Sequence, residues 1–302
     1  QMYTGKHIAT KLWVGDYTTG DTFEKFAQKA EGIKRIGVLR ADVDNLGQTF
    51  VAGFAGKYAT LSRTAALSRQ LSIFFKYYIR SILKNGEYHI DGEKKLTERN
   101  ATIVYSGGDD VFIVGAWNEV IELSIDLQEK FKKYTQGTLS ISSGIGIYEC
   151  TYPIGAIANE TGEMEAESKR MPEKDSVTLM DDGETHLINE LEICDGTYRW
   201  EELYKSVLGE KYDVIQDFLG ESDERGMSFL YRMLELIRNQ KEKINFARFV
   251  YLLSRLEPDK EGEKKEKYRK FSRKMYQWVQ SEKDCRELKT AINLYAYMHR
   301  EK

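Results

Sequence analysis

The sequence predicts an α+β protein: a ferredoxin-like domain with the element order βαββαβ, followed by an all-α helical bundle. Two observations lead to this class. Up to about residue 180, short runs rich in Val and Ile alternate with stretches of helical periodicity. After about residue 195 the helical periodicity continues, but β-branched runs become rare. We therefore expect a lead-in segment at 1–31, the α+β domain at 32–192 and a helical domain at 193–302.

Periodicity defines the elements one at a time. The longest helix, expected at 61–83, carries Leu67, Leu71, Phe74 and Tyr78 on one face. The elements expected in the α+β domain are strand 33–39, helix 61–83, strands 101–105 and 111–115, helix 118–134, strand 139–148, helix 153–170 and strand 176–180. The helical segments expected after them are 198–208, 211–219, 226–240, 244–256, 266–280 and 284–299.

Composition limits the function classes. The 302 residues are 41% hydrophobic and 31% charged, as is typical of a soluble globular protein with room for two cores. The net charge of -3 gives no overall basic field for nucleic acid, although a local basic site is compatible with it. The three cysteines form no C-x-x-C pair, which argues against a disulfide framework or zinc site and favours the cytoplasm. No apolar run approaches the roughly 20 residues that span a bilayer.

The predicted topology brings carboxylates together. In the ferredoxin-like plan the first strand lies beside the third and antiparallel to it. The end of the first strand, with Asp42 and Asp44, therefore meets the start of the third strand, with Asp109 and Asp110. Like charges this close require a shared proton or a divalent cation, and a set of hard oxygens without His or Cys favours Mg²⁺ or Mn²⁺.

The two turns add features of a phosphate site. The segment Asn45–Gly47 leads from a strand toward a helical region, where backbone N–H groups can face an anion. Gly107 and Gly108 carry no side chains that would keep a ligand away from the hairpin. Each motif taken singly is explained equally well by turn chemistry. Together, on neighbouring strands, they predict a metal–triphosphate site.

Other candidates are weaker. The four histidines are scattered, and Ser106 has no His or Asp partner at the placement that nucleophilic catalysis requires. We expect Ser106 to cap the turn or to contact a bound base.

Three motifs resemble a known family. They are RADVDNLG at 40–47, YSGGDD at 105–110 and INFARFVYLLSRLEP at 244–258. The combination is similar to the large subunit of type III-A CRISPR effector (Csm) complexes, specifically to its second Palm domain and C-terminal helical domain. The resemblance covers nearly the whole chain, to about Pro258.

The resemblance implies a nucleotidyl transferase that makes cyclic oligoadenylate from ATP with Mg²⁺ or Mn²⁺ and is switched on by target RNA. The implied partners are other Csm subunits, with guide RNA and target RNA bound through the complex. The residues implied as catalytic and metal-binding are Asp42, Asp109 and Asp110. Those implied as nucleotide-binding are Val43, Asp44, Asn45, Leu46, Gly47, Ser106, Gly107, Gly108 and Lys169.

The resemblance also implies an active site completed by a first Palm domain. The family's HD nuclease domain is not found, because the sequence has no His-Asp dipeptide, so we expect no cleavage of single-stranded DNA by this chain. Two other functions stay open. One is a scaffold with a vestigial nucleotide pocket. The other is a diguanylate cyclase, which would use GTP and carry a Glu in the turn.

Overall fold

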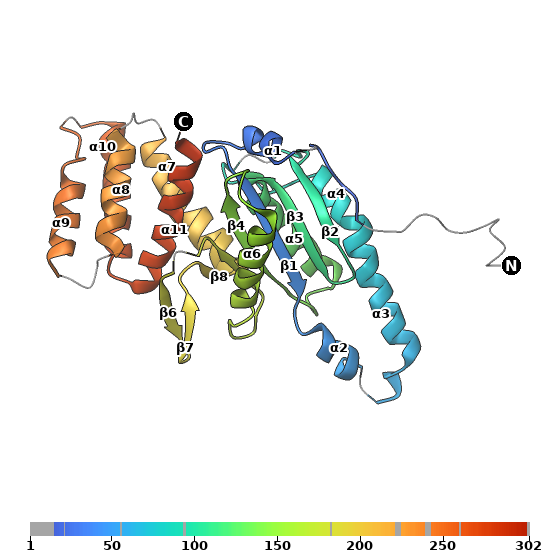
Figure 1. Cartoon of the computed structure of the whole chain (residues 1–302). Helices are drawn as coiled ribbons and strands as arrows, with labels where there is room; N and C mark the ends of the chain where they lie inside the picture. The colour runs from blue at the N-terminus through green and yellow to red at the C-terminus, as the bar shows by residue number, and fades with distance from the viewer. Residues whose placement is uncertain are drawn as a thin grey trace.

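The computed structural model describes residues 15–300 except 21, 55, 93–94, 182, 221–224, 239–242 and 260. A six-stranded mixed sheet in the order β2-β3-β1-β4-β5-β8 forms its centre, and a separate hairpin joins β6 to β7. The strands are β1 (Ile36–Val43), β2 (Ala101–Ser106), β3 (Asp110–Ala116), β4 (Ile141–Tyr148), β5 (Ser176–Leu179), β6 (Thr185–Ile188), β7 (Leu191–Cys194) and β8 (Thr197–Arg199). Helices flank this sheet, and a group of helices stands beside it (Figure 1).

The helices fall into two groups. Those of the sheet domain are α1 (Phe23–Lys29), α2 (Leu46–Ala52), the short 3₁₀ turn η1 (Gly56–Tyr58), α3 (Leu61–Ile73), the π-helical turn η2 (Phe74–Tyr78), α4 (Ile79–Lys84), α5 (Trp117–Tyr134) and α6 (Ile154–Ser168). Those of the helical domain are the π-helical segment η3 (Glu202–Tyr212), α7 (Asp213–Leu219), α8 (Arg225–Arg238), α9 (Lys243–Ser254), α10 (Glu263–Trp278) and α11 (Glu282–His299).

The predicted βαββαβ order is confirmed from β1 to β4. β1 lies between β3 and β4 and pairs antiparallel with both, as the ferredoxin-like plan requires. Two details differ from the prediction. β1 occupies Ile36–Val43 instead of 33–39, so Asp42 lies inside the strand. The helix predicted at 61–83 is interrupted by η2, where the amide of Ile79 donates to the carbonyl of Phe74.

The sheet continues past residue 192. β8 is its edge strand and pairs antiparallel with β5. The helix expected at 198–208 therefore begins later, as η3, because Thr197–Arg199 is extended. The prediction missed β6, β7 and β8 because strands of three or four residues are too short to show alternation.

Alternate residues of β1 face two different layers. Leu39, Ala41 and Val43 belong to the large core, which α5 also lines. Ile36 and Val38 face the opposite side, in a smaller cluster with residues of α1 and α6. This alternation is the period of two that a strand imposes. β1 is thus buried on both faces, and its end is held in a fixed position.

α11 connects the helical domain to the sheet domain. The hydroxyl of Tyr198 donates to the carbonyl of Arg286 at 3.2 Å and lies 2.7 Å from the Thr290 hydroxyl. Near the other end of α11, the Tyr297 carbonyl accepts the amide of Ile33 at 2.9 Å. Within the described part of the chain, no helix is both long enough and apolar enough to cross a lipid bilayer.

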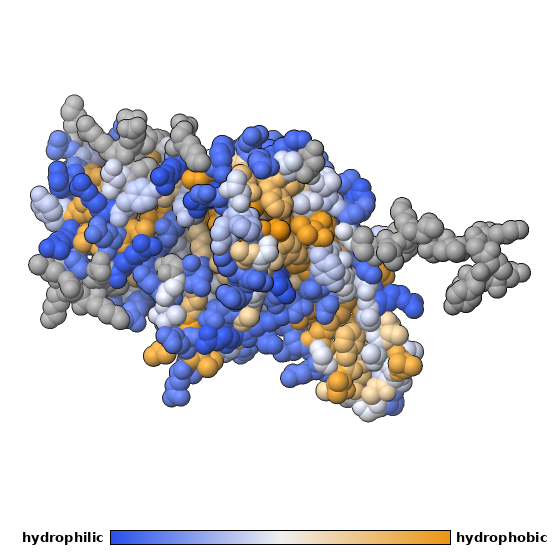
Figure 2. All heavy atoms as spheres, viewed as in Figure 1, coloured by the Kyte–Doolittle hydropathy of each residue, from blue (hydrophilic) through white to orange (hydrophobic). Residues whose placement is uncertain are grey.

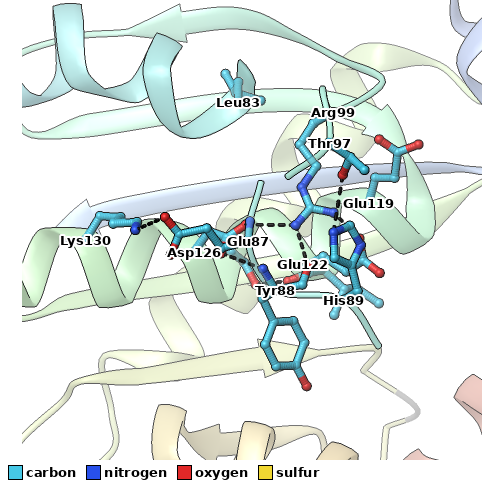
Figure 3. Close-up of polar contacts among 12 residues, drawn as sticks. Leu83, Glu87, Tyr88, His89, Thr97, Arg99, Glu119, Glu122, Asp126 and Lys130 are labelled. Atoms are coloured by element: carbon cyan, nitrogen blue, oxygen red, sulfur yellow. Dashed lines mark hydrogen bonds and ion pairs between the residues drawn. The ribbon is translucent and has the colours of Figure 1, made fainter. Parts of the chain in front are cut away.

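A buried ion network fixes residues 87–90 and Arg99 against α5. The Arg99 guanidinium, 1% exposed, pairs with Glu122 and with Asp126, the latter at 2.8 Å (Figure 3). The same carboxylates accept backbone amides of the segment: Asp126 accepts that of Tyr88 at 2.9 Å, and Glu122 accepts that of Ile90 at 3.0 Å. Burial raises the pKa of Glu122 to about 7 although Arg99 opposes the shift. We call these three ionic side chains the Arg99 network.

Candidate functional site

The carboxylates expected from the strand order meet at one end of β1 and β3. Asp42 lies opposite Asp110 in the ladder, and the amide of Val43 donates to the carbonyl of Asp109 at 3.2 Å. Burial, followed by the charges of Asp42 and Asp110, raises the pKa of Asp109 above its usual value. The three side chains therefore share one electrostatic environment, and a cation placed among them would relieve their repulsion.

The two glycines of the hairpin between β2 and β3 have different surroundings. A Cβ on Gly107 would lie 2.3 Å from the Tyr105 hydroxyl and 2.7 Å from Oδ1 of Asp110. A Cβ on Gly108 would meet only Oγ of Ser72, at 3.8 Å. A side chain at position 107 would therefore displace the ends of the Tyr105 and Asp110 side chains, whereas Gly108 leaves open space beside the hairpin.

Lys169 follows α6 and reaches Asp42 on the face of the sheet that α6 covers. Its ammonium pairs with Asp42 and, at 2.6 Å, with Glu165. Burial lowers the pKa of Lys169, but the hydrogen bonds to these two carboxylates raise it more, so the net shift is upward. Glycine at position 144 of β4 lets α6 approach closely, because a Cβ there would lie 2.5 Å from the amide nitrogen of Glu165. The helix lysine expected from the resemblance is therefore at the carboxylates.

The turn after β1 is held from inside the protein. Asp44 is 3% exposed, and its Oδ2 accepts the Ser140 hydroxyl at 2.7 Å and the Asp175 amide at 3.1 Å. Asn45 adopts the left-handed conformation with φ of 52°, and its side chain accepts the Lys174 ammonium at 2.7 Å. Asp44 is thus a buried anchor for the turn. Lys174 is a cation at the site that sequence reasoning missed, since no spacing connects it to Asn45.

Three more of the expected residues contribute little through their side chains. Val43 is buried in the core, and Leu46 packs against the same core. The Ser106 side chain is also buried, and its hydroxyl donates to the carbonyl of Phe75 in η2. Ser106 therefore ties the hairpin to the helical segment, and the expected contact with a bound base is not available to this hydroxyl. Gly47 has open space around its α-carbon.

The donor set is compatible with Mg²⁺ or Mn²⁺. Across the described residues, no group of three or more His, Cys, Asp or Glu side chains is arranged to hold a metal by itself. Magnesium rarely needs such a cage, because one or two carboxylates and the phosphates of a substrate normally complete its octahedron. Asp42 and Asp109 supply hard oxygens, and the pKa of Asp109 is raised first by burial and then by the charges of Asp42 and Asp110. The residues fit a metal that arrives with a nucleotide.

Two known domain families match the chain. The Cas10/Cmr2 second palm domain matches residues 35–178. The second helical domain of the Cmr2 subunit of the CRISPR RNA silencing complex matches residues 216–301. A curated relative, the CRISPR system single-strand-specific deoxyribonuclease Cas10/Csm1 (subtype III-A) of Mycobacterium tuberculosis, is 42% identical over 99% of this chain. The chain belongs to the Cas10/Csm1 family.

The chain is a part-length match within this family, since it spans 36% of the Mycobacterium relative. The deoxyribonuclease activity in that relative's name is that of a protein nearly three times as long as this chain. Residues 35–178 and 216–301 correspond to the sheet domain and helical domain described above.

Solved Cas10/Csm1 structures share the fold. The Csm1-Csm4 subcomplex of the type III-A CRISPR-Csm interference complex superposes with a TM-score of 0.73 and 26% identity, covering 96% of this chain and 40% of the other. A Csm1-Csm4 cassette in complex with one ATP gives a TM-score of 0.65 and 26% identity, and one in complex with cA3 gives 0.65 and 25%. Each of these two covers 93% of this chain and 40% of the other.

Proposed function

We propose that this chain carries the second Palm half of a nucleotidyl-transferase site that converts ATP to cyclic oligoadenylate in a type III-A CRISPR effector complex. The observation that carries the proposal is the convergence of Asp42, Asp109 and Asp110 where β1 and β3 pair. The ATP-bound and cA3-bound Csm1-Csm4 cassettes, which share this fold, support the choice of adenine nucleotides.

Each side chain has a part in this reaction. Asp42 and Asp109, with Asp110 beside them, would hold Mg²⁺ or Mn²⁺. Such a metal would supply Lewis-acid chemistry at the α-phosphate and charge compensation for the leaving pyrophosphate. Lys169 lies against Asp42 and would move its ammonium toward the triphosphate. The turn at Asn45–Gly47 and the open side of Gly108 would admit the phosphates.

The bond changes balance without a further reactant. The ribose hydroxyl oxygen of one ATP bonds to the α-phosphorus of another, and the bond from that phosphorus to the bridging oxygen breaks. Pyrophosphate leaves with the electron pair, and the hydroxyl proton passes to solvent. The fixed carboxylates and Lys169 act by positioning and charge, which are the main contributions a protein makes to phosphoryl transfer.

The proposal includes the setting of the reaction. A first Palm domain would supply the other half of the site. Target RNA, bound with guide RNA and other Csm subunits, would switch it on. Such a complex would work in the cytoplasm.

Calorimetric titration of ATP into this chain, with Mg²⁺ or Mn²⁺, tests the proposal. We expect metal-dependent binding that disappears in the Asp109→Ala, Asp110→Ala variant. A matched control removes two exposed carboxylates elsewhere, with Glu163→Ala and Asp259→Ala, and should bind as the parent does. Binding that survives the loss of Asp109 and Asp110 would refute the proposal. Stronger binding of GTP than of ATP would favour a diguanylate cyclase instead.

One observation favours a scaffold with a vestigial pocket. Lys169 already neutralises Asp42 and Glu165, so the protein compensates part of the negative charge without a metal. In that case neither nucleotide would bind in the presence of metal, and the double Asp variant would behave like the parent in the titration.

A further inference from the structure

The segment after the β1 turn forms a helical arm that makes little contact with the rest of the protein. We define the arm as α2, η1 and α3. α2 and η1 bury no residue, and α3 buries only Leu71, near its end. In Figure 1 these elements project from the lower edge of the sheet domain. A helix of this length rarely stays solvated on nearly all sides unless something packs on it, because most helical stability comes from tertiary contacts.

The arm has an unusual charge. From Leu46 to Gly86 the sequence has no Asp or Glu but has six cations, although the whole chain has a net charge of -3. Three of these cations lie on the arm and are exposed: Lys57, Arg63 and Arg69. In the part of the chain that the structure describes, no carboxylate pairs with any of the three. A solvated helix face usually alternates both signs, so this one-sided charge is complementary to a polyanion.

The arm also exposes apolar and aromatic surface between its cations. Leu61 is 87% exposed and Val51 is 86% exposed. Figure 2 shows orange, apolar side chains over this part of the molecule. The ring of Tyr58 is half exposed, and the Arg63 guanidinium lies 4.4 Å from its centroid. A ring flanked by cations is how proteins that bind single strands combine base stacking with phosphate contacts.

The arm begins and ends at the carboxylate site. Its first helix follows Asn45, and its last turn places Ser72 beside Gly108. The base of the arm is fixed on α5, because the hydroxyl of Tyr134 donates to the carbonyl of Gln70 at 3.0 Å. The hairpin carboxylates Asp109 and Asp110 lie near this base, whereas the sequence of the arm contains no Asp or Glu.

We propose that the arm binds single-stranded nucleic acid, with Lys57, Arg63 and Arg69 contacting phosphates and Tyr58 stacking on a base. The charge pattern favours a polyanion over a protein partner, and the exposed ring favours an unpaired strand over a duplex, whose bases are stacked on one another. The proposal does not depend on nucleotidyl transfer, since binding along the arm requires neither metal nor ATP.

Fluorescence anisotropy with a labelled 12-nucleotide oligoadenylate RNA, without metal or ATP, tests the arm. We expect binding with a dissociation constant on the order of 10 µM at 50 mM salt, weakening as salt rises. The variant Lys57→Gln, Arg63→Gln, Arg69→Gln should bind more weakly. Its slope of log affinity against log salt should be shallower by about 2, since each phosphate contact on a single strand contributes about 0.7. The variant Tyr58→Ala should weaken binding by at least about fivefold with the salt slope unchanged.

The matched control removes one lysine and two arginines that are also exposed, on the helical domain: Lys264→Gln, Arg232→Gln and Arg273→Gln. It makes the same change in net charge and should bind RNA as the parent does. All of these substitutions are at exposed positions or on an exposed ring, so the fold should be kept, and circular dichroism checks it. The proposal is overturned if the parent binds no RNA at 50 mM salt, or if the control loses as much affinity as the arm variant. Equal binding of a duplex and the single strand would overturn the stacking role of Tyr58.

Discussion

Replacing Arg99 by Met should destabilise the fold far more than replacing an exposed arginine. The Arg99 side chain is 1% exposed, and its partners Glu122 and Asp126 are 7% and 4% exposed. Without the guanidinium, the two buried carboxylates lose the cation that pairs with both of them, and only the His89 imidazole, 3.5 Å from Glu122, remains as an ion-pair partner of Glu122. Breaking a buried ion pair by removing one partner costs about 3–5 kcal/mol. This is a large share of the roughly 5–15 kcal/mol by which a domain is stable.

The stability that Arg99→Met loses should depend on pH, and the raised pKa of Glu122 determines the direction of this dependence. The folded-state pKa of Glu122 is raised to about 7, from an ordinary value of 4.5. The native state therefore holds a proton that the unfolded state has released, so this group stabilises the fold at acid pH and the contribution is lost as pH rises through 7. Without Arg99, the charged form of Glu122 is even less stable in the folded protein, because Arg99 favours that form. The variant should therefore lose more stability at pH 8 than at pH 5.5.

Urea unfolding followed by tryptophan fluorescence measures both effects. The control is Arg80→Met, because Arg80 pairs at 3.2 Å with Asp16 and the two side chains are 51% and 79% exposed. Such a surface pair is worth at most about 1 kcal/mol. If Arg99→Met costs no more than Arg80→Met, or costs the same at both pH values, the account of the Arg99 network is wrong.

Three further predictions concern the site. Gly107→Ala should displace the ends of the Tyr105 and Asp110 side chains and lower the free energy of unfolding by up to about 1 kcal/mol, whereas Gly108→Ala should change it by less than about 0.5 kcal/mol. Urea unfolding compares the two variants, and a larger loss for Gly108→Ala would contradict the hairpin geometry. In metal-free protein, Asp42→Asn should lower the pKa of Asp109, because the charge of Asp42 raises it. Carbon-13 NMR titration of the Asp109 carboxyl measures this pKa, and an unchanged value would contradict the coupling between the two carboxylates. Asp44→Leu should cost about 1–3 kcal/mol in the same unfolding assay, because it leaves the Ser140 hydroxyl and the part-buried amide of Asp175 without their acceptor. Unchanged stability would contradict the role of Asp44 as the anchor of the turn.

The strand order and the meeting of Asp42 with Asp109 could be predicted because they follow from long, periodic elements and one topological rule. Details that depend on single tertiary contacts could not. Asp44 looked like a ligand from its spacing, yet hydrogen bonds from Ser140 and the Asp175 amide turn it inward. Lys174 reaches the site from a loop with no periodicity at all. Which of the site residues contact ATP stays a prediction for the titration.

The π-helical turn η2 separates two properties of the helix that an ordinary turn would link. The wide turn between α3 and α4 holds one residue more than an α-helical turn does, in nearly the same rotation about the axis. Deleting a single residue there would restore α-helical winding and leave the direction of α3 nearly unchanged. The Phe75 carbonyl, which accepts the Ser106 hydroxyl, would lose its place at the same time. The extra residue in η2 thus serves the link to the hairpin, and its loss would free the hairpin while the arm still points the same way.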